Sequence, residues 1–151
     1  MKDMKIYFTK AQFENLLKIV YLGNWMANAI HNGTEEDPLD GGLEAIEHYV
    51  FAFAKDFGLE NLVEYSKDFE QFFPTDAFDD LMIEYIDKYD EDCFWEELFY
   101  RMTDRDFERA YSNEEIEKME MLELFEKQEP FRDKWDKEIS ERGIERLEIN
   151  P

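Results

Sequence analysis

The stretch LLKIVYLGNWMANAI, residues 16–30, decides the fold. Its only interruptions are Lys18, Gly23, Asn24 and Asn28. Because the remaining residues are apolar on every side, the stretch predicts a helix that other elements surround. Thr9 and Gln12 form a capping-box pattern just before it. We therefore expect a helix over residues 10–31 at the centre of a helical bundle.

Further helices are predicted downstream of the loop at residues 32–42, where apolar residues recur at spacings of three and four. The first of these helices carries a seam made by Leu43, Ile46, Val50, Phe53 and Phe57. Residues 59–73 are expected to form short helical turns, and later helices begin near residues 76, 91 and 113, with a final one after Pro130. The predicted fold is mainly α, a compact bundle of five to seven helices around the N-terminal helix.

Two short stretches are candidates for strands, residues 4–8 and 144–149. Neither has another partner, so we expect at most one small two-stranded sheet that pairs the two termini. There is no internal repeat, and one domain over residues 1–151 is the simplest organisation. The balanced charge and thin apolar stripe of residues 112–151 make an appended helical arm the alternative.

Negative charge dominates the composition: 39 Asp and Glu against 17 Lys and Arg give a net charge of −22. Residues 34–100 alone carry 21 acidic and three basic side chains, a net charge of −18. Direct binding to nucleic acid is therefore excluded, because phosphates would be repelled. A solvated surface that serves solubility is one interpretation of this charge, and a surface that attracts a basic protein is the other.

The carboxylates most suited to an interaction surface share one face of the predicted helix near residue 76. They are Asp76, Asp80, Glu84 and Asp87, and we call them the ridge. At helical spacing they recur about every 5 to 6 Å, with only Lys88 nearby. A ridge of this kind is expected to face lysine or arginine on a partner, and a DNA-mimicking inhibitor of a DNA-binding protein is the special case.

Several chemistries are excluded by residue type. No glycine-rich phosphate loop is present, and with only Cys93, His31 and His48 the chain cannot build a four-ligand structural zinc site. A disulfide framework is also excluded. No signal peptide is recognisable, and no apolar run approaches the roughly 20 residues of a membrane span. We expect a cytoplasmic protein with no cofactor and no contact with membranes.

One polar cluster interrupts the apolar N-terminal helix: Asn24, Asn28 and His31 lie at i, i+4 and i+7. Buried polar groups must be hydrogen-bonded, so a buried network or a solvated helix end is one interpretation. The other pairs His31 with Glu44 and His48 of the next helix, since two histidines and one carboxylate can hold a divalent metal. The alternative for Glu44 and His48 is an ion pair along one helix face.

Four motifs carry a resemblance to a known group of proteins: KIYFT at residues 5–9, YLGNW at 21–25, FAKDFG at 53–58 and FWEEL at 94–98. Over residues 4–110 the chain resembles small, acidic, helix-rich bacterial proteins of uncharacterised function. The resemblance implies a bacterial cytoplasmic origin and no activity, cofactor or ligand.

The sequence favours a non-enzymatic interaction protein whose acidic surface binds a basic protein partner. The alternative is a small metal-dependent enzyme that uses His31, Glu44 and His48. Metal content separates the two hypotheses, since only the enzyme requires a bound ion.

Overall fold

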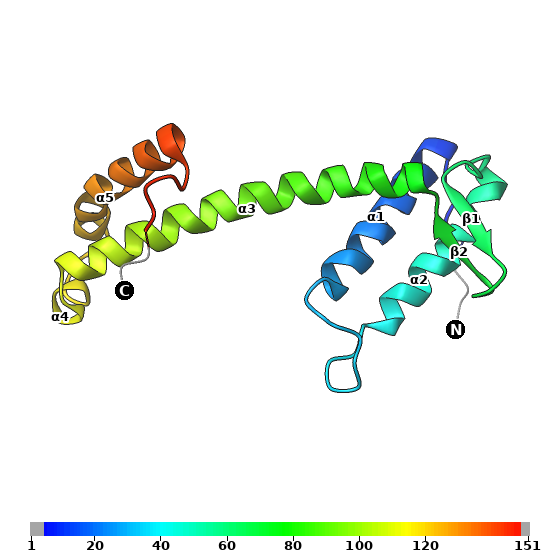
Figure 1. Ribbon diagram of the computed structural model, residues 1–151, viewed down its shortest axis with the longest axis horizontal. Coiled ribbons are helices and arrows are strands. Elements are labelled where there is room, and N and C mark those ends of the chain that lie inside the picture. The colour runs from blue at the N-terminus through cyan, green and yellow to red at the C-terminus, as the bar shows by residue number, and fades with distance from the viewer. Residues whose placement is uncertain (1–4, 149–151) are drawn as a thin grey trace. The chain divides into compact units, whose positions relative to one another are not determined.

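The computed structural model describes residues 5–148, which form five α-helices, one 3₁₀ helix and one two-stranded sheet (Figure 1). The elements are α1 Lys10–Asn28, α2 Gly41–Phe51, η1 Ala54–Phe57, β1 Val63–Ser66, β2 Gln71–Pro74, α3 Asp76–Ala110, α4 Asn113–Ile116 and α5 Met121–Arg142. The prediction of a mainly α fold with one small sheet is confirmed. No helix in this part of the chain is long and apolar enough to cross a membrane.

The chain divides into two compact units, residues 1–87 and 88–151, with the boundary inside α3. In the N-terminal unit α1, α2 and the β1–β2 hairpin accompany the start of α3 (Figure 1). The C-terminal unit holds the rest of α3 with α4 and α5. It begins at Lys88, whereas the predicted arm begins at residue 112.

Helix α1 begins as predicted. The Thr9 hydroxyl accepts a hydrogen bond from the Gln12 backbone N–H at 3.3 Å, and the Gln12 side chain accepts one from the Thr9 N–H at 2.9 Å. The helix ends at Asn28, three residues before the predicted end. Only one face of it is covered: Phe13 and Leu17 are buried, whereas Ile19 and Met26 are exposed.

The core of the N-terminal unit is aromatic. Its largest buried side chains are Phe13, Leu17, Phe51, Phe78 and Met82, which come from α1, α2 and α3. The Phe13 ring stacks on Phe57 of η1 with centroids 4.0 Å apart and planes within 5°. These side chains hold the three helices in one packed unit, because burial of a large apolar side chain contributes about 1.5 to 3 kcal/mol.

The seam predicted for residues 43–57 is only partly correct, since of its five residues only Val50 and Phe57 pack against the core. Leu43, Ile46 and Phe53 are exposed, and Val50 and Phe57 are only half-buried. The buried side chains are instead Glu47, Phe51 and Ala54. Apolar residues occur on several sides of this segment, so their spacing alone does not select the face that packs. The spacing of apolar residues gives no sign that the buried face includes a glutamate, Glu47.

The two-stranded sheet is not where the sequence predicted it. Residues 5–8 and 144–148 form no strand, and Met4 and Ile149 lie outside the described residues. The sheet is instead the antiparallel β1–β2 hairpin, which lies in the segment where short helical turns were expected. Val63 pairs with Pro74, and Ser66 pairs with Gln71. A strand pairs most readily with a neighbour a few residues away, and β-branched and aromatic residues favour this conformation.

Helix α3 continues without interruption through residues 90–92, where a boundary between two helices was expected. Acidic residues alone do not end a helix, and this segment holds neither glycine nor proline. Phe78, Met82 and Ile86 are the buried residues of its first half, whereas the neighbouring Leu81 is 37% exposed.

The C-terminal unit has a small core of its own, in which Phe107 of α3 and Trp135 of α5 are buried. Helix α4 begins at the predicted residue 113, with a capping box in which the Ser112 hydroxyl accepts from the Glu115 N–H. Helix α5 runs through Pro130, so the predicted break there is wrong. Proline removes one N–H donor from the helix interior, but contacts hold the helix on both sides of it: the Phe131 ring packs edge-on against Phe107, and Arg132 lies over the Phe125 ring.

Candidate functional site

The ridge lies on the first three turns of α3, and Asp76, Asp80, Glu84 and Asp87 are all exposed. Helix geometry places the four carboxylates on one face, about 4.5 to 6 Å apart along the axis. At about 100° per residue this face is opposite the buried Phe78, Met82 and Ile86. The ridge therefore points into solvent because the other side of the same helix is anchored in the core.

The two units have similar net charges but differ in how their charged side chains form ion pairs. Residues 1–87 carry 18 acidic and six basic side chains, and residues 88–151 carry 21 and 11, so the net charges are −12 and −10. In the second unit basic side chains pair with acidic ones, as in Arg101–Glu97 at 2.8 Å and Lys127–Glu123 at 2.8 Å. The ion pairs of the first unit within residues 5–148 leave the four ridge carboxylates unpaired.

The predicted polar cluster forms hydrogen bonds that join α1 to α2. Asn28 Nδ2 donates to Asn24 Oδ1 at 2.7 Å, and Asn24 Nδ2 donates to the buried carboxylate of Glu47. Asn28 Oδ1 accepts from the backbone N–H of Asp40 at 2.6 Å, and Asp40 caps α2. The two asparagines therefore connect the end of α1 to the start and the buried face of α2.

His31 is engaged by the loop that follows α1. Its Nδ1 lies 2.6 Å from Asp37 Oδ1, and Asp37 Oδ2 accepts from the Asn32 N–H at 3.0 Å. The hydrogen bond from His31 holds the pKa of Asp37 below its usual value. Sequence reasoning missed Asp37, although its place six residues after His31 in a tight loop is the signal that could have identified it.

The proposed metal ligands His31, Glu44 and His48 do not come together. No group of three or more His, Cys, Asp or Glu side chains within residues 5–148 is arranged to hold a metal ion. His48 Nδ1 lies 2.7 Å from the carbonyl oxygen of Phe72, and its Nε2 lies 3.7 Å from Glu44 Oε1. The interpretation that fits these contacts is the ion pair of Glu44 and His48 along α2, because His31 is held by Asp37.

A cavity of about 290 Å³ lies between α1, α2 and the hairpin in the N-terminal unit. Its lining includes the carboxylates of Glu44 and Glu47 and the rings of Tyr21, Trp25 and His48. Burial raises the pKa of Glu47. Burial and a hydrogen bond of 2.5 Å from the Tyr21 hydroxyl to Asp79 raise the pKa of Tyr21. Sequence reasoning found Glu44 and His48 and missed Glu47, which occupies an expected apolar face.

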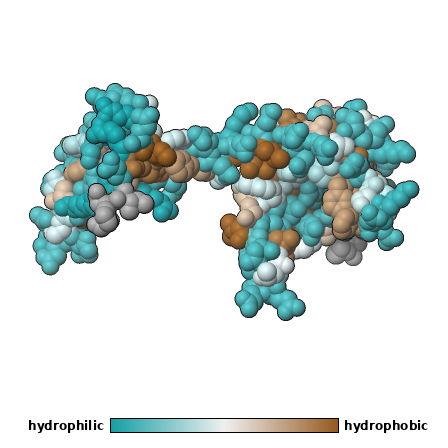
Figure 2. All heavy atoms as spheres, in the orientation of Figure 1, coloured by the Kyte–Doolittle hydropathy of each residue, from teal (hydrophilic) through white to brown (hydrophobic). Residues whose placement is uncertain are grey.

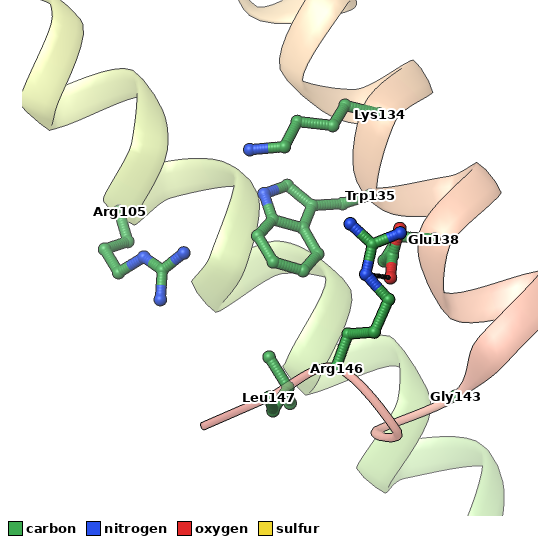
Figure 3. Close-up of a pocket in the computed structure, with 7 residues that line it drawn as sticks. All are labelled: Arg105, Lys134, Trp135, Glu138, Gly143, Arg146 and Leu147. Carbon is green, nitrogen blue, oxygen red and sulfur yellow. Dashed lines mark ion pairs between the residues drawn. The ribbon is translucent and has the colours of Figure 1, made fainter. Parts of the chain in front are cut away.

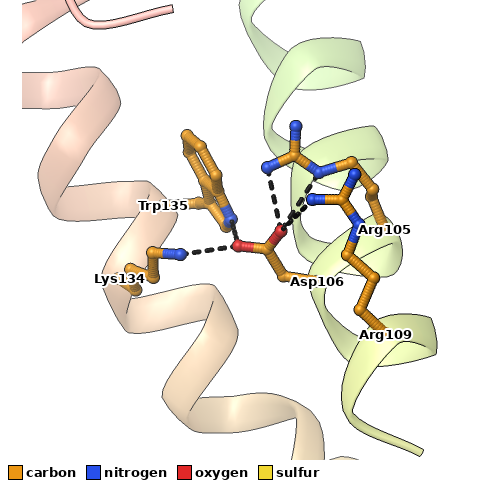
Figure 4. A network of polar contacts seen from close by, with 5 residues as sticks. All are labelled: Arg105, Asp106, Arg109, Lys134 and Trp135. Atoms are coloured by element: carbon orange, nitrogen blue, oxygen red, sulfur yellow. Dashed lines mark hydrogen bonds and ion pairs between the residues drawn. The ribbon is translucent and has the colours of Figure 1, made fainter. Parts of the chain in front are cut away.

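The C-terminal unit contains a second cavity, of about 220 Å³, beside Trp135 (Figure 3). The cations around it are already used: Arg146 pairs with Glu138 at 3.2 Å, and Arg105 and Lys134 pair with Asp106 at 2.8 and 2.6 Å. The indole Nε1–H of Trp135 also donates to Asp106, at 2.9 Å (Figure 4).

Asp106 is therefore the centre of a network that joins α3 to α5. Partial burial opposes its ionisation, but hydrogen bonds from Lys134, Arg105 and Trp135 outweigh burial and lower the pKa of Asp106 to about 2. Its side chain is 12% exposed. We interpret the network as structural, because the donors converge on a carboxylate of the chain itself. Sequence spacing gives no sign of a contact across 28 residues.

The surface around these features is mainly hydrophilic. Figure 2 shows several separate hydrophobic patches on the visible face and no continuous one. Comparison of the chain with models of protein families, with curated protein sequences and with solved structures gives no match. The side chains and surfaces described above are therefore the basis for inferring its function.

Proposed function

We propose that the chain is a non-enzymatic, cytoplasmic interaction protein whose ridge binds a basic protein partner. The observation that carries the proposal is the exposure of four carboxylates on one face of α3 without a basic side chain of residues 5–148 paired to them. Charge that serves solubility alone does not need to recur on one helix face. A row of unpaired carboxylates is stabilised when lysine or arginine side chains approach it.

Apolar area for such an interface lies directly beside the ridge. Leu81 and Ile83 of α3 are 37% and 40% exposed, and helix geometry places them on the two flanks of the carboxylate row. Interfaces usually combine a desolvated apolar centre with charged residues at the rim. The exposure of Leu81 and Ile83 therefore supports the proposal.

DNA mimicry is the special case of this function. Duplex DNA carries one charge per about 1.7 Å of axis, whereas the ridge has one per about 5 Å. The charge density of the ridge along its axis is thus about one third of that of duplex DNA. A basic protein that recognises spaced carboxylates fits this geometry better than one that requires DNA-like charge density, and competition with duplex DNA for the captured partner separates the two cases.

The experiment captures partners with the full chain, identifies them, and titrates the purified partner against three versions of the protein. The ridge variant carries Asp76→Asn, Asp80→Asn, Glu84→Gln and Asp87→Asn. The control variant carries Asp56→Asn, Glu60→Gln, Glu64→Gln and Asp68→Asn, which neutralise four exposed carboxylates of the same unit outside α3. Both variants change the net charge equally.

We expect the ridge variant to lose about 1 to 3 kcal/mol of binding free energy at about 0.1 M salt, since exposed pairs contribute about 0.2 to 1 kcal/mol each. The control variant should lose much less, and all three proteins should converge at about 1 M salt, where the Debye length is about 3 Å. Equal losses in both variants would mean that binding depends on net charge and not on the position of the ridge, and would refute the proposal.

A further inference from the structure

The cavity of the N-terminal unit contains a buried carboxylate that forms no ion pair with any of the described residues. Glu47 is only 7% exposed, yet the one hydrogen bond to its side chain within residues 5–148 comes from the neutral amide of Asn24. Buried carboxylates are normally paired with a cation or accept several hydrogen bonds. Because Glu47 also lines the cavity, a donor bound there would reach it.

A second carboxylate lies at the same cavity. Glu44 lines it, and its Oε1 lies 3.7 Å from His48 Nε2. His48 Nδ1 donates to the carbonyl oxygen of Phe72, because a carbonyl oxygen can only accept. The contact of Nε2 with Glu44 is, at 3.7 Å, longer than a hydrogen bond, so the Glu44 carboxylate still has lone pairs for a bound donor. A ligand that donates several hydrogen bonds and carries positive charge satisfies this arrangement.

Aromatic rings provide the remaining walls. Tyr21 and Trp25 of α1 and Phe73 of β2 line the cavity, and all three are half-buried. Indole and phenol rings attract organic cations through their faces. Ligand pockets for complete small molecules begin at about 300 Å³, so a cavity of about 290 Å³ suits a small group or a single side chain.

We propose that this cavity receives one lysine or arginine side chain of the basic partner, with Glu47 and Glu44 accepting its hydrogen bonds and Trp25 packing against its alkyl chain or charged head. The inference rests on the proposed function, because the partner that supplies the side chain is the one that the ridge attracts. The raised pKa of Glu47 agrees with it, since a carboxyl group buried without a cation is stabilised in its charged form when a cation arrives.

The first test uses n-butylammonium and n-butylguanidinium as probes of the two side chains, and 1-butanol as the neutral control. The indole N–H signals of Trp25, Trp95 and Trp135 are followed by NMR in the full chain. We expect both cations to shift the Trp25 signal saturably and to leave the other two unchanged, with no saturable shift from 1-butanol. Absence of a saturable shift, or an equal response to 1-butanol, would overturn the inference.

Glu47→Gln provides the matched variant, because glutamine keeps the size of the side chain and an oxygen to accept from Asn24. It should weaken binding of both cations by about tenfold or more, since a charge-assisted hydrogen bond is lost. Glu60→Gln, at an exposed position of the same unit, should leave the affinity unchanged. Equal affinity of Glu47→Gln and the wild-type protein would contradict the role of Glu47.

The second test measures the purified partner against Glu47→Gln with an intact ridge. A loss of about tenfold that persists at high salt supports the inference, because a buried pair is screened much less than the ridge. Loss of partner binding in the ridge variant with none in Glu47→Gln refutes the inference and leaves the proposed function standing. If the small cations bind saturably but neutralisation of the ridge does not change partner capture, the proposed function is refuted. The cavity is then supported as a cation site that is independent of the ridge.

Discussion

Replacement of Asp106 by asparagine tests how the C-terminal unit is held together. The change keeps the size of the side chain and removes the charge that accepts from Lys134 at 2.6 Å, Arg105 at 2.8 Å and Trp135 at 2.9 Å. A pKa that falls from 3.8 to about 2 corresponds to about 2.5 kcal/mol of preferential stabilisation of the charged form. Lys134 and Arg105 are 58% and 40% exposed, so solvent screening reduces the expected loss to about 1 to 2 kcal/mol.

The pH dependence has a definite sign. Because the folded-state pKa of Asp106 lies below its unfolded value, its contribution to stability is complete above the unfolded pKa and is lost as the pH falls through the folded one. The difference between wild-type and Asp106→Asn protein should therefore be largest at neutral pH. It should fall to roughly half near pH 3 and become small near pH 2.

Urea denaturation followed by tryptophan fluorescence measures this difference, with hydrogen exchange of α5 amides to assign the transition to the C-terminal unit. Asp104→Asn is the control, because Asp104 is an exposed carboxylate on the same helix and takes part in no ion pair within residues 5–148. Its effect should stay within about 0.5 kcal/mol. Equal stability of the two variants at neutral pH would refute the assignment of Asp106 as the centre of the network.

Three further predictions concern the N-terminal unit. Phe51→Ala should cost about 3 to 5 kcal/mol in urea unfolding because Phe51 is fully buried, whereas Phe53→Ala, at 39% exposure, should cost less than half of that; similar losses would restore the predicted seam. Asn28→Ala should cost about 1 to 2 kcal/mol by leaving Asn24 Oδ1 and the Asp40 N–H without a partner, and unchanged exchange of the Asp40 amide would contradict this role. Glu47→Gln should raise the urea midpoint at neutral pH and lose this advantage at acidic pH. The reason is that burial raises the pKa of Glu47, so the charged carboxylate destabilises the fold only above that pKa. A midpoint below that of the wild-type protein at neutral pH would contradict this prediction.

Local signals predicted the parts of the fold that depend on neighbouring residues. The capping box at Thr9 forms as expected, and a second one at Ser112 begins α4 where a helix start was predicted; each uses groups only three positions apart. The β1–β2 hairpin was missed because its apolar residues fit helical turns as well as short strands. Pro130 predicted a break that tertiary packing overrides.

The contacts that sequence reasoning missed join distant parts of the chain. The ridge was visible in the sequence because helical spacing alone brings its carboxylates to one face. Glu47 was not, because its burial follows from the packing of α1, which no pattern on α2 reveals. The link from Asp106 to Trp135 spans 29 residues and joins two helices, and no spacing rule reaches that far.

Carbodiimide cross-linking of the complex with the captured basic partner tests the central claim most directly. The reagent joins a carboxylate to a lysine amine only where the two are in contact, and mass spectrometry identifies the joined residues. The account predicts that the cross-links from the N-terminal unit fall mainly on Asp76, Asp80, Glu84 and Asp87 and disappear at high salt. Cross-links spread evenly over the exposed carboxylates, such as Glu60 and Asp68, would contradict it.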